Sequence, residues 1–393
     1  MNSKILNTVI QKFIQNNLNT SSSDLILKGT SFKEVDTREV VEQIESKRRS
    51  KKKLPTWFNT SQIYFPNKLN IEQTSSEITA KYKANIISGE SIIDITGGFG
   101  VDCFYFSKNF KSLVHCEVNN NLSTIVKHNY KQLGVTNVKA ISGNGLEYLE
   151  TSKAKFDWIY IDPSRRHDQK GKVFQLSDCL PNVPKHLNVL FKASSNILIK
   201  TSPLLDISLG VNELRHVKKI YVVAVKNEVK ELLWVLENHF NGAIQINTVN
   251  LKDEGIEALE FNREDEKSLE IQYNAPLNYL YEPNAAILKS GAFNSVAAQY
   301  NLSKLHQHSH LYTSEHLIDF PGRRFKVDNK ILYNKSRIKK LGIKKANITT
   351  RNFPETVRQL RKKFKILDGG NQYLFFTTNL KNEKILLVTS KIK

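Results

Sequence analysis

Three carboxylates, Asp94, Glu117 and Asp162, stand where apolar stretches of the sequence end. An apolar stretch of this kind that stops at a turn is typical of a buried strand. A carboxylate at the end of a strand can accept hydrogen bonds from the ammonium, hydroxyl or amine groups of a ligand. These three residues are therefore the first candidates for a binding or catalytic site.

A glycine-rich turn follows Asp94, and a helix over Val101–Lys108 is expected after it. Glycines let the backbone approach a ligand, and the N-terminus of a helix offers free N–H donors. We expect this turn to pass under the amino-acid part of a ligand, with Asp94 accepting from its ammonium group directly or through water. The candidate binding residues at this turn are Asp94, Gly97, Gly98, Gly100 and Asp102.

Glu117 stands twenty residues beyond Gly97, at the end of the second expected strand. An acidic residue at this place can accept both hydroxyls of a ribose. The dinucleotide fingerprint G-x-G-x-x-G would need a third glycine where Cys103 stands, so the pattern disfavours a nicotinamide enzyme. A tight turn without a ligand is a further alternative, but such a turn does not need three glycines flanked by two aspartates.

Asn144 stands between two glycines after the third expected strand. Its carbonyl oxygen can accept from the amino group of an adenine, and we predict it as a cofactor-binding residue. A simple turn built from Gly and Asn explains the same residues equally well.

The fourth expected strand ends in Asp162-Pro163-Ser164-Arg165-Arg166. This resembles the Asp/Asn-Pro-Pro-aromatic tetrad of amino-methyltransferases, which implies that the acid and a proline carbonyl receive an amine. Ser164 and Arg165 depart from that tetrad, although a guanidinium can also stack on a base or bind a phosphate. We predict Asp162, Pro163 and Arg165 as catalytic residues and Arg166 as a nucleic-acid contact. Ion pairs with nearby acids would also explain the two arginines.

The residues just ahead of the first strand are polar. Thr74-x-x-Glu77 fits a capping box at the start of a helix. A lid over the cofactor is an equally good interpretation of this segment.

Short apolar strands alternate with helices such as Asn120–Leu133 and Val229–Glu237 through the middle of the chain. This order is typical of a parallel sheet with helices on both faces. We predict an α/β fold with a Rossmann-like, seven-stranded domain over residues 86–275 and a helical N-terminal region over residues 1–85. The expected strands are Ser91–Ile95, Leu113–Glu117, Val138–Ile141, Asp157–Ile161, Asn196–Lys200, Ile220–Val225 and one near Ala243–Asn250.

The positive charge of the chain is concentrated at its C-terminal end. The 393 residues carry a net charge of +20, and residues 321–393 hold 20 Lys and Arg against four Asp and Glu. Coding bias toward lysine accounts for some of the total but not for this distribution. A field so concentrated attracts a polyanion. We therefore predict a nucleic-acid-binding domain over residues 321–393, after a connecting region over residues 276–320.

A short helix is expected within Arg351–Lys365, entered through a proline, with Val357, Leu360 and Phe364 facing its core. Gly369 and Gly370 are expected to end it. The predicted nucleic-acid-binding residues form a basic ridge on its other side: Arg358, Arg361, Lys362 and Lys365.

Several classes of protein are disfavoured. No stretch approaches the roughly 18 apolar residues that a membrane span needs, and the N-terminus has an amphipathic rather than a secretory pattern. The three cysteines, Cys103, Cys116 and Cys179, show no spacing of metal ligands. We expect a cytoplasmic protein with reduced, buried thiols, no metal and no membrane contact.

In combination, these motifs resemble those of a bacterial family of class I S-adenosylmethionine-dependent methyltransferases with a C-terminal THUMP-like domain. The resemblance implies S-adenosylmethionine as cofactor, a ferredoxin-like piece over residues 276–320 and a small α+β THUMP-like domain over residues 321–393. It rests on the acidic residues and glycines above together with five tail motifs: Tyr281-Glu282-Pro283-Asn284-Ala285-Ala286, Leu311-Tyr312-Thr313-Ser314, Phe320-Pro321-Gly322-Arg323, Arg351-Asn352-Phe353-Pro354 and Asp368-Gly369-Gly370.

The sequence therefore predicts N-methylation of a base in RNA, either tRNA or rRNA. A DNA amino-methyltransferase is the first alternative, although no base-reading loops are identified. A non-enzymatic RNA-binding factor that retains the cofactor site is the second. The complete set of Asp94, the glycines, Glu117 and Asp162 argues against it, because a binding module has no use for that set.

Overall fold

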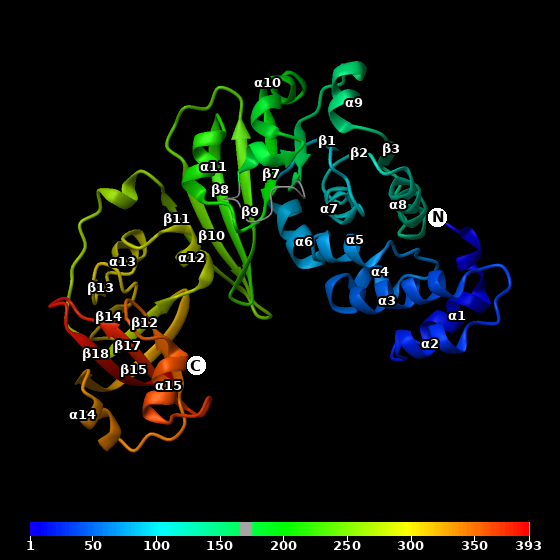
Figure 1. Cartoon of the computed structure of the whole chain (residues 1–393). Coiled ribbons are helices and arrows are strands. Elements are labelled where there is room, and N and C mark those ends of the chain that lie inside the picture. The colour runs from blue at the N-terminus through cyan, green and yellow to red at the C-terminus, as the bar shows by residue number, and fades with distance from the viewer. Residues whose placement is uncertain (166–174, 393) are drawn as a thin grey trace. The chain divides into compact units, whose positions relative to one another are not determined.

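The computed structural model describes residues 1–165 and 175–392. Its N-terminal region is helical, as predicted, and the helices group together in Figure 1. The longest, α3, starts at an N-cap in which Asp36 accepts from the N–H of Arg38, and it contacts α1, α2, α4 and α5. The elements are η1 (Ser3–Leu6), α1 (Thr8–Asn16), α2 (Ser22–Lys28), α3 (Thr37–Lys53), α4 (Pro55–Asn59), α5 (Lys68–Gln73) and α6 (Glu77–Ile86).

A nine-stranded sheet follows within the described residues, in the order β11-β10-β8-β9-β7-β4-β1-β2-β3. The strands from β3 to β7 in this order pair in parallel, which confirms the predicted α/β architecture. The strands are β1 (Ser91–Asp94), β2 (Ser112–Glu117), β3 (Val138–Ser142), β4 (Trp158–Ile161), β7 (Asn196–Thr201), β8 (Val217–Val225), β9 (Glu228–Glu237), β10 (Gln245–Leu251) and β11 (Ile256–Asn262).

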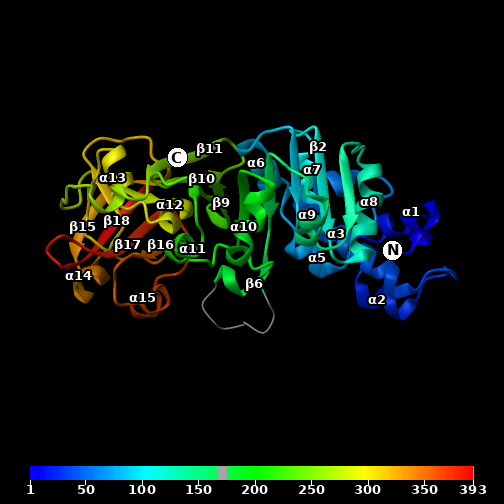
Figure 2. The same ribbon diagram turned by 90° about the horizontal axis from the view of Figure 1, so that it is seen from above.

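Helices connect the parallel strands, and a small two-stranded ladder, β5 (Ser164–Arg165) with β6 (Cys179–Leu180), follows β4. Figure 2 gives a second view of these elements from above. The helices are α7 (Val101–Phe106), α8 (Asn120–Gln132), α9 (Gly145–Ser152), the short η3 (Leu176–Asp178), α10 (Val183–Ala193) and α11 (Ile207–Glu213).

The predicted helix over Val229–Glu237 is wrong, because this segment is strand β9. The two residues between β8 and β9, Lys226 and Asn227, both have positive φ, which is the geometry of a tight hairpin turn. Residues 231–236 are all buried, as expected for a strand inside a sheet. Glu, Lys and Leu favour helices when isolated, but burial within the sheet overrides that preference. β9 thus lies between β8 and β7 in the sheet, and β10 and β11 extend the sheet beyond β8.

The chain divides into two compact units, residues 1–217 with 234–240, and residues 218–233 with 241–393. The second unit contains a seven-stranded sheet within the described residues, in the order β13-β14-β12-β15-β18-β17-β16. Its strands are β12 (Tyr279–Pro283), β13 (Ser303–Lys304), β14 (Tyr312–Ser314), β15 (Gly322–Leu332), β16 (Asn347–Thr350), β17 (Gln372–Thr378) and β18 (Lys384–Ile392). β15, β18 and β17 run side by side in Figures 1 and 2.

The helices of the second unit are short, and the sheet packs on both faces. Leu360, Leu374 and Phe376 belong to one apolar cluster, and Phe325 and Phe375 belong to another. The helical elements are η4 (Asp265–Lys267), α12 (Ala285–Ser290), α13 (Ser295–Gln299), α14 (Lys335–Lys340) and α15 (Val357–Phe364). The α+β architecture predicted for the C-terminal region is therefore confirmed.

Helix α15 differs from its prediction at both ends. It is entered through a capping box of Thr356 and Gln359 rather than through a proline. It ends at Lys365, whose backbone is left-handed, so the predicted stop at Gly369 and Gly370 is wrong. Leu360 is buried as predicted.

All three cysteines are buried, as expected. Among the helices of the described residues, none has the length and apolar character needed to cross a membrane. In the same residues, the structure shows no group of three or more His, Cys, Asp or Glu side chains that could hold a metal ion.

Candidate active site

Asp94 and Glu117 end β1 and β2, and Asp162 directly follows β4. β1 pairs in parallel with both β2 and β4, so all three carboxylates lie at one edge of the sheet. Thr96 links two of them: its N–H and hydroxyl donate to Asp94 Oδ1 at 2.9 and 3.2 Å, and its hydroxyl accepts from the N–H of Asp162 at 2.7 Å. The structure therefore brings these three predicted residues together.

The three glycines of the turn have different roles. A Cβ on Gly97 would lie 2.3 Å from the buried imidazole of His115, and a Cβ on Gly100 would lie 2.3 Å from the hydroxyl of Tyr130. Both positions therefore require glycine for packing. Gly98 has φ +55°, and a Cβ there would meet only the Thr96 carbonyl oxygen at 3.8 Å. Gly98 is thus the glycine that borders open space.

Glu117 is held in place by the backbone of the turn. Its Oε2 accepts from the N–H of Gly98 at 2.9 Å, and its Oε1 accepts from the N–H of Asn119 at 2.7 Å. An ionised carboxylate has about four acceptor positions, so about two remain for a ligand. The side chain is half-buried at the end of β2.

Asn144 is the N-cap of α9, where its Oδ1 accepts from the N–H of Leu146 at 2.9 Å. Helix capping is therefore one role of this asparagine, and its contact with the cofactor stays a prediction. Next to it, Gly143 borders open space, whereas a Cβ on Gly145 would collide with Ile95.

Asp102 belongs to a buried polar network that sequence reasoning missed. Its Oδ2 accepts from the hydroxyls of Ser75 and Tyr160, both at 2.8 Å. The Nζ of Lys83, which is fully buried, lies 3.3 Å from Asp102 Oδ1. Burial alone raises the pKa of Asp102, but the opposing effects of Lys83, Lys200 and these hydrogen bonds leave it lowered. The side chain is therefore an internal anion whose partners hold α7 against α6.

The predicted capping box at Thr74 and Glu77 is wrong. Ser76 is the N-cap of α6, and its hydroxyl accepts from the N–H of Thr79. The buried carboxylate of Glu77 instead accepts from Thr56 and from the hydroxyl of Tyr105. Glu77 thus ties the N-terminal helices to α7, a long-range contact that the local pattern cannot indicate.

Asp94 is the electrostatically unusual group of the site. Asp94 is only 2% exposed, and Cys103 Sγ lies 3.3 Å from Asp94 Oδ2. Burial is the main cause that raises its pKa to about 7, with smaller contributions from Asp102 and Asp162. A cation beside this carboxylate would favour its ionised form.

Asp162 pairs with Lys200, whose Nζ contacts Asp162 Oδ2. The side chains are 32% and 15% exposed, so the pair borders solvent at the edge of the sheet. Lys200 lies near the end of β7, and the prediction from sequence did not include it. A charged residue that ends an apolar strand is the same signal that indicated Asp94. In such a site the carboxylate of Asp162 can accept an N–H group of a ligand, and the ammonium group of Lys200 can donate to a ligand acceptor.

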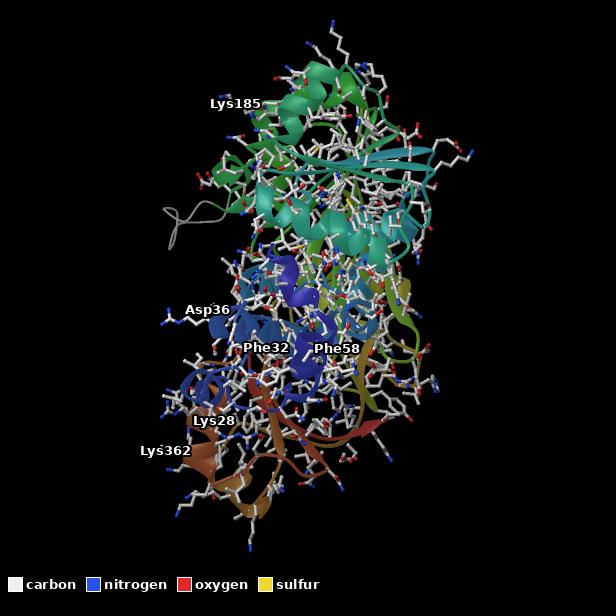
Figure 3. All side chains as sticks on the ribbon, turned by 90° about the vertical axis from the view of Figure 1, so that its right-hand side faces the viewer. Lys28, Phe32, Asp36, Phe58, Lys185 and Lys362 are labelled. Carbon is white, nitrogen blue, oxygen red and sulfur yellow. The ribbon has the colours of Figure 1, made fainter. Side chains whose placement is uncertain are left out.

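The predicted arginines and lysines belong to the β5–β6 ladder and to helix α15 with its C-cap, except for one that lies outside the described residues. The backbone of Arg165 pairs with Cys179 in the β5–β6 ladder, and Arg166 lies outside the described residues. Arg361 donates to the carbonyl oxygens of Ala346 and Ile366 and contacts Asp368. Much of its donor capacity is therefore used within its own unit. Arg358, Lys362 and Lys365 are exposed on α15, and Lys362 is labelled in Figure 3.

Comparison with known proteins adds independent findings. Residues 279–321 match a ferredoxin-like domain, and residues 322–391 match a THUMP-like domain. The crystal structure of a candidate methyltransferase from Porphyromonas gingivalis W83 is 33% identical, with a TM-score of 0.91 and coverage of 100% of both chains. The chain belongs to the class I methyltransferases that carry a C-terminal THUMP-like domain.

More distant methyltransferase structures share less with this member of the family. An O-methyltransferase from Bacillus cereus in complex with SAH is 13% identical, covers 44% of this chain and 88% of its own, and has a TM-score of 0.34. The tRNA m1G37 methyltransferase of M. jannaschii is 12% identical, covers 42% and 50%, and has a TM-score of 0.30. No curated protein matches the sequence.

Proposed function

We propose that this methyltransferase uses S-adenosylmethionine to N-methylate a base in RNA, either tRNA or rRNA. The observation that carries the proposal is the alignment of Asp94, Glu117 and Asp162 on three neighbouring strand ends around a glycine turn. This is the place where ligands bind in open α/β sheets. Family membership and the THUMP-like match support the reaction class and the RNA substrate.

The described residues fit the cofactor. Gly98 and Gly143 both border open space, so the backbone of the turn and of the β3 end can approach a ligand. Glu117 is oriented by two backbone N–H groups and retains acceptor positions for the two ribose hydroxyls. The buried Asp94 is suited to the ammonium group, because a buried carboxylate gains most from a cationic partner.

When bound, the cofactor supplies a methyl group on a positively charged sulfur. The work of the protein is then to align the acceptor nitrogen with that methyl group. Asp162 accepts an N–H of the base, and its backbone stays fixed because its own N–H donates to Thr96. Lys200 contacts the Asp162 carboxylate and orients it. The proton of the methylated nitrogen leaves to Asp162 or to water.

Calorimetry of the purified full chain with S-adenosylmethionine tests the cofactor. Nucleoside mass spectrometry of RNA from cells with and without the gene tests the substrate. The proposal expects cofactor binding and one methylated nucleoside that disappears with the gene. A methyl mark lost from DNA, and not from RNA, would instead support the DNA amino-methyltransferase.

A further inference from the structure

The second unit contains a buried acid that binds two arginines at once. Glu282 lies in β12, and its side chain is only 5% exposed. Its Oε2 accepts from Nε of Arg323 and also contacts Nη2 of that arginine, and its Oε1 accepts from Nη2 of Arg351 at 2.9 Å. Arg323 lies opposite Glu282 in the paired strand β15, and Arg351 directly follows β16. Three separate strands therefore meet at one carboxylate.

The charges of this cluster do not balance. A buried carboxylate is compensated by one hydrogen-bonded cation, and Glu282 has two. The group of Glu282, Arg323 and Arg351 carries a net charge of +1. The side chains of Arg323 and Arg351 are 35% and 32% exposed, so the excess charge lies at the surface and not in the core.

The arginines also retain unused donors. A guanidinium carries five N–H groups. The contacts with Glu282, and one of 3.5 Å from Arg323 to Thr349, use only Nε and Nη2. Within residues 1–165 and 175–392, the Nη1 atoms of Arg323 and Arg351 make no hydrogen bond. Two oriented guanidinium groups with free N–H donors match the oxygens of a phosphate.

Positive groups act on the neighbouring His310. Burial is the main cause that lowers the pKa of His310 to about 4, and Lys304, Arg351 and His308 lower it further. Lys304 and Arg351 both act on His310, so these two positive charges lie in the same region of the second unit.

We propose that Arg323 and Arg351, oriented by Glu282, form a binding site for one phosphate group of the RNA backbone. This inference rests on the proposed function, because it takes RNA as the ligand. The site differs from the exposed ridge of α15, since its donors are fixed by a buried acid before RNA arrives. A preorganised donor loses little side-chain freedom on binding.

The experiment measures the affinity of the full chain for fluorescein-labelled bulk tRNA across a salt series. Arg351→Gln and Arg323→Gln should each weaken binding roughly tenfold and lower the slope of log affinity against log salt by roughly 0.7–0.9. Arg351→Lys should keep the slope, since it keeps the charge, yet still weaken binding. Arg337→Gln on the exposed face of α14 is the matched control and should have a smaller effect.

The outcomes separate the two proposals. If the wild-type chain binds S-adenosylmethionine but no RNA, the RNA substrate itself is wrong. If wild type binds tRNA and Arg351→Gln binds it with the same affinity and slope, Glu282 and its arginines are only a structural ion pair. Equal losses from Arg337→Gln and Arg351→Gln would mean a diffuse basic surface, which also overturns the site. If Arg351→Gln fails to fold, Arg351→Lys still tests the phosphate site. An unchanged tRNA affinity of Arg351→Lys would contradict binding through the oriented guanidinium group.

Discussion

Asp94→Asn should weaken cofactor binding and remove its dependence on pH. The folded protein raises the pKa of Asp94 from 3.8 to about 7, mainly by burial. If the ammonium group of S-adenosylmethionine contacts this carboxylate, only the ionised form binds it well. At pH 6 about a tenth of the carboxylate is ionised, so wild-type affinity should be roughly tenfold lower than at pH values above 7. The amide of the variant carries no charge at any pH, and its affinity should stay low and flat.

Isothermal titration calorimetry at pH 6.0 to 7.5 measures this directly, and buffers of different ionisation enthalpy report the proton released on binding. Asp157→Asn is a suitable control, because Asp157 is exposed and accepts from backbone N–H groups at the opposite end of β1. That variant should keep the wild-type profile. A wild-type affinity that does not change over this range, or an Asp94→Asn variant with the wild-type profile, would refute the role of Asp94.

Further predictions concern stability, the ribose contact, the acceptor and the C-terminal unit. Because the pKa of Asp94 is raised in the folded state, the stability that it contributes is full below about pH 4 and is lost as pH rises to about 7. Asp94→Asn should therefore make the melting temperature less dependent on pH over that range. Glu117→Ala should lower cofactor affinity by about ten- to a hundredfold in calorimetry, through loss of roughly 1.5–3 kcal/mol, and an unchanged affinity would remove it from the site. Asp162→Ala should abolish methyl transfer but keep cofactor binding, and normal turnover would contradict its role. Charge reversal at Arg358 and Lys362 should lower the salt slope of RNA binding by roughly 0.7–0.9 per lost phosphate contact, whereas an equal slope would mean a solvated face.

The sheet and its strand-end carboxylates could be predicted because their signal is local. A buried parallel strand is a short apolar run, and a polar residue at its end must lie at the edge of the sheet. Asp94, Glu117 and Asp162 were therefore identifiable from sequence. Strand β9 was not, because its Glu, Lys and Leu residues favour a helix and only the turn at Lys226 and Asn227 indicates a hairpin.

The partners of the site residues could not be predicted, because they come from distant positions. Lys83 reaches Asp102 from a preceding helix, and Lys200 reaches Asp162 from the next strand of the sheet. Arg361 shows the same limit. Its helical spacing indicates an exposed ridge, yet its donors bind carbonyl oxygens at Ala346 and Ile366, which only the folded loops bring near.

Methyl transfer in a defined mixture tests the central claim most directly. The purified full chain is incubated with S-adenosylmethionine labelled in its methyl group and with unmodified bulk tRNA, rRNA or DNA, and the digested nucleosides are separated. The account predicts label in one nucleoside of an RNA substrate with the wild-type chain and none with Asp162→Ala. Label in DNA alone, or equal label in RNA with both proteins, would contradict it.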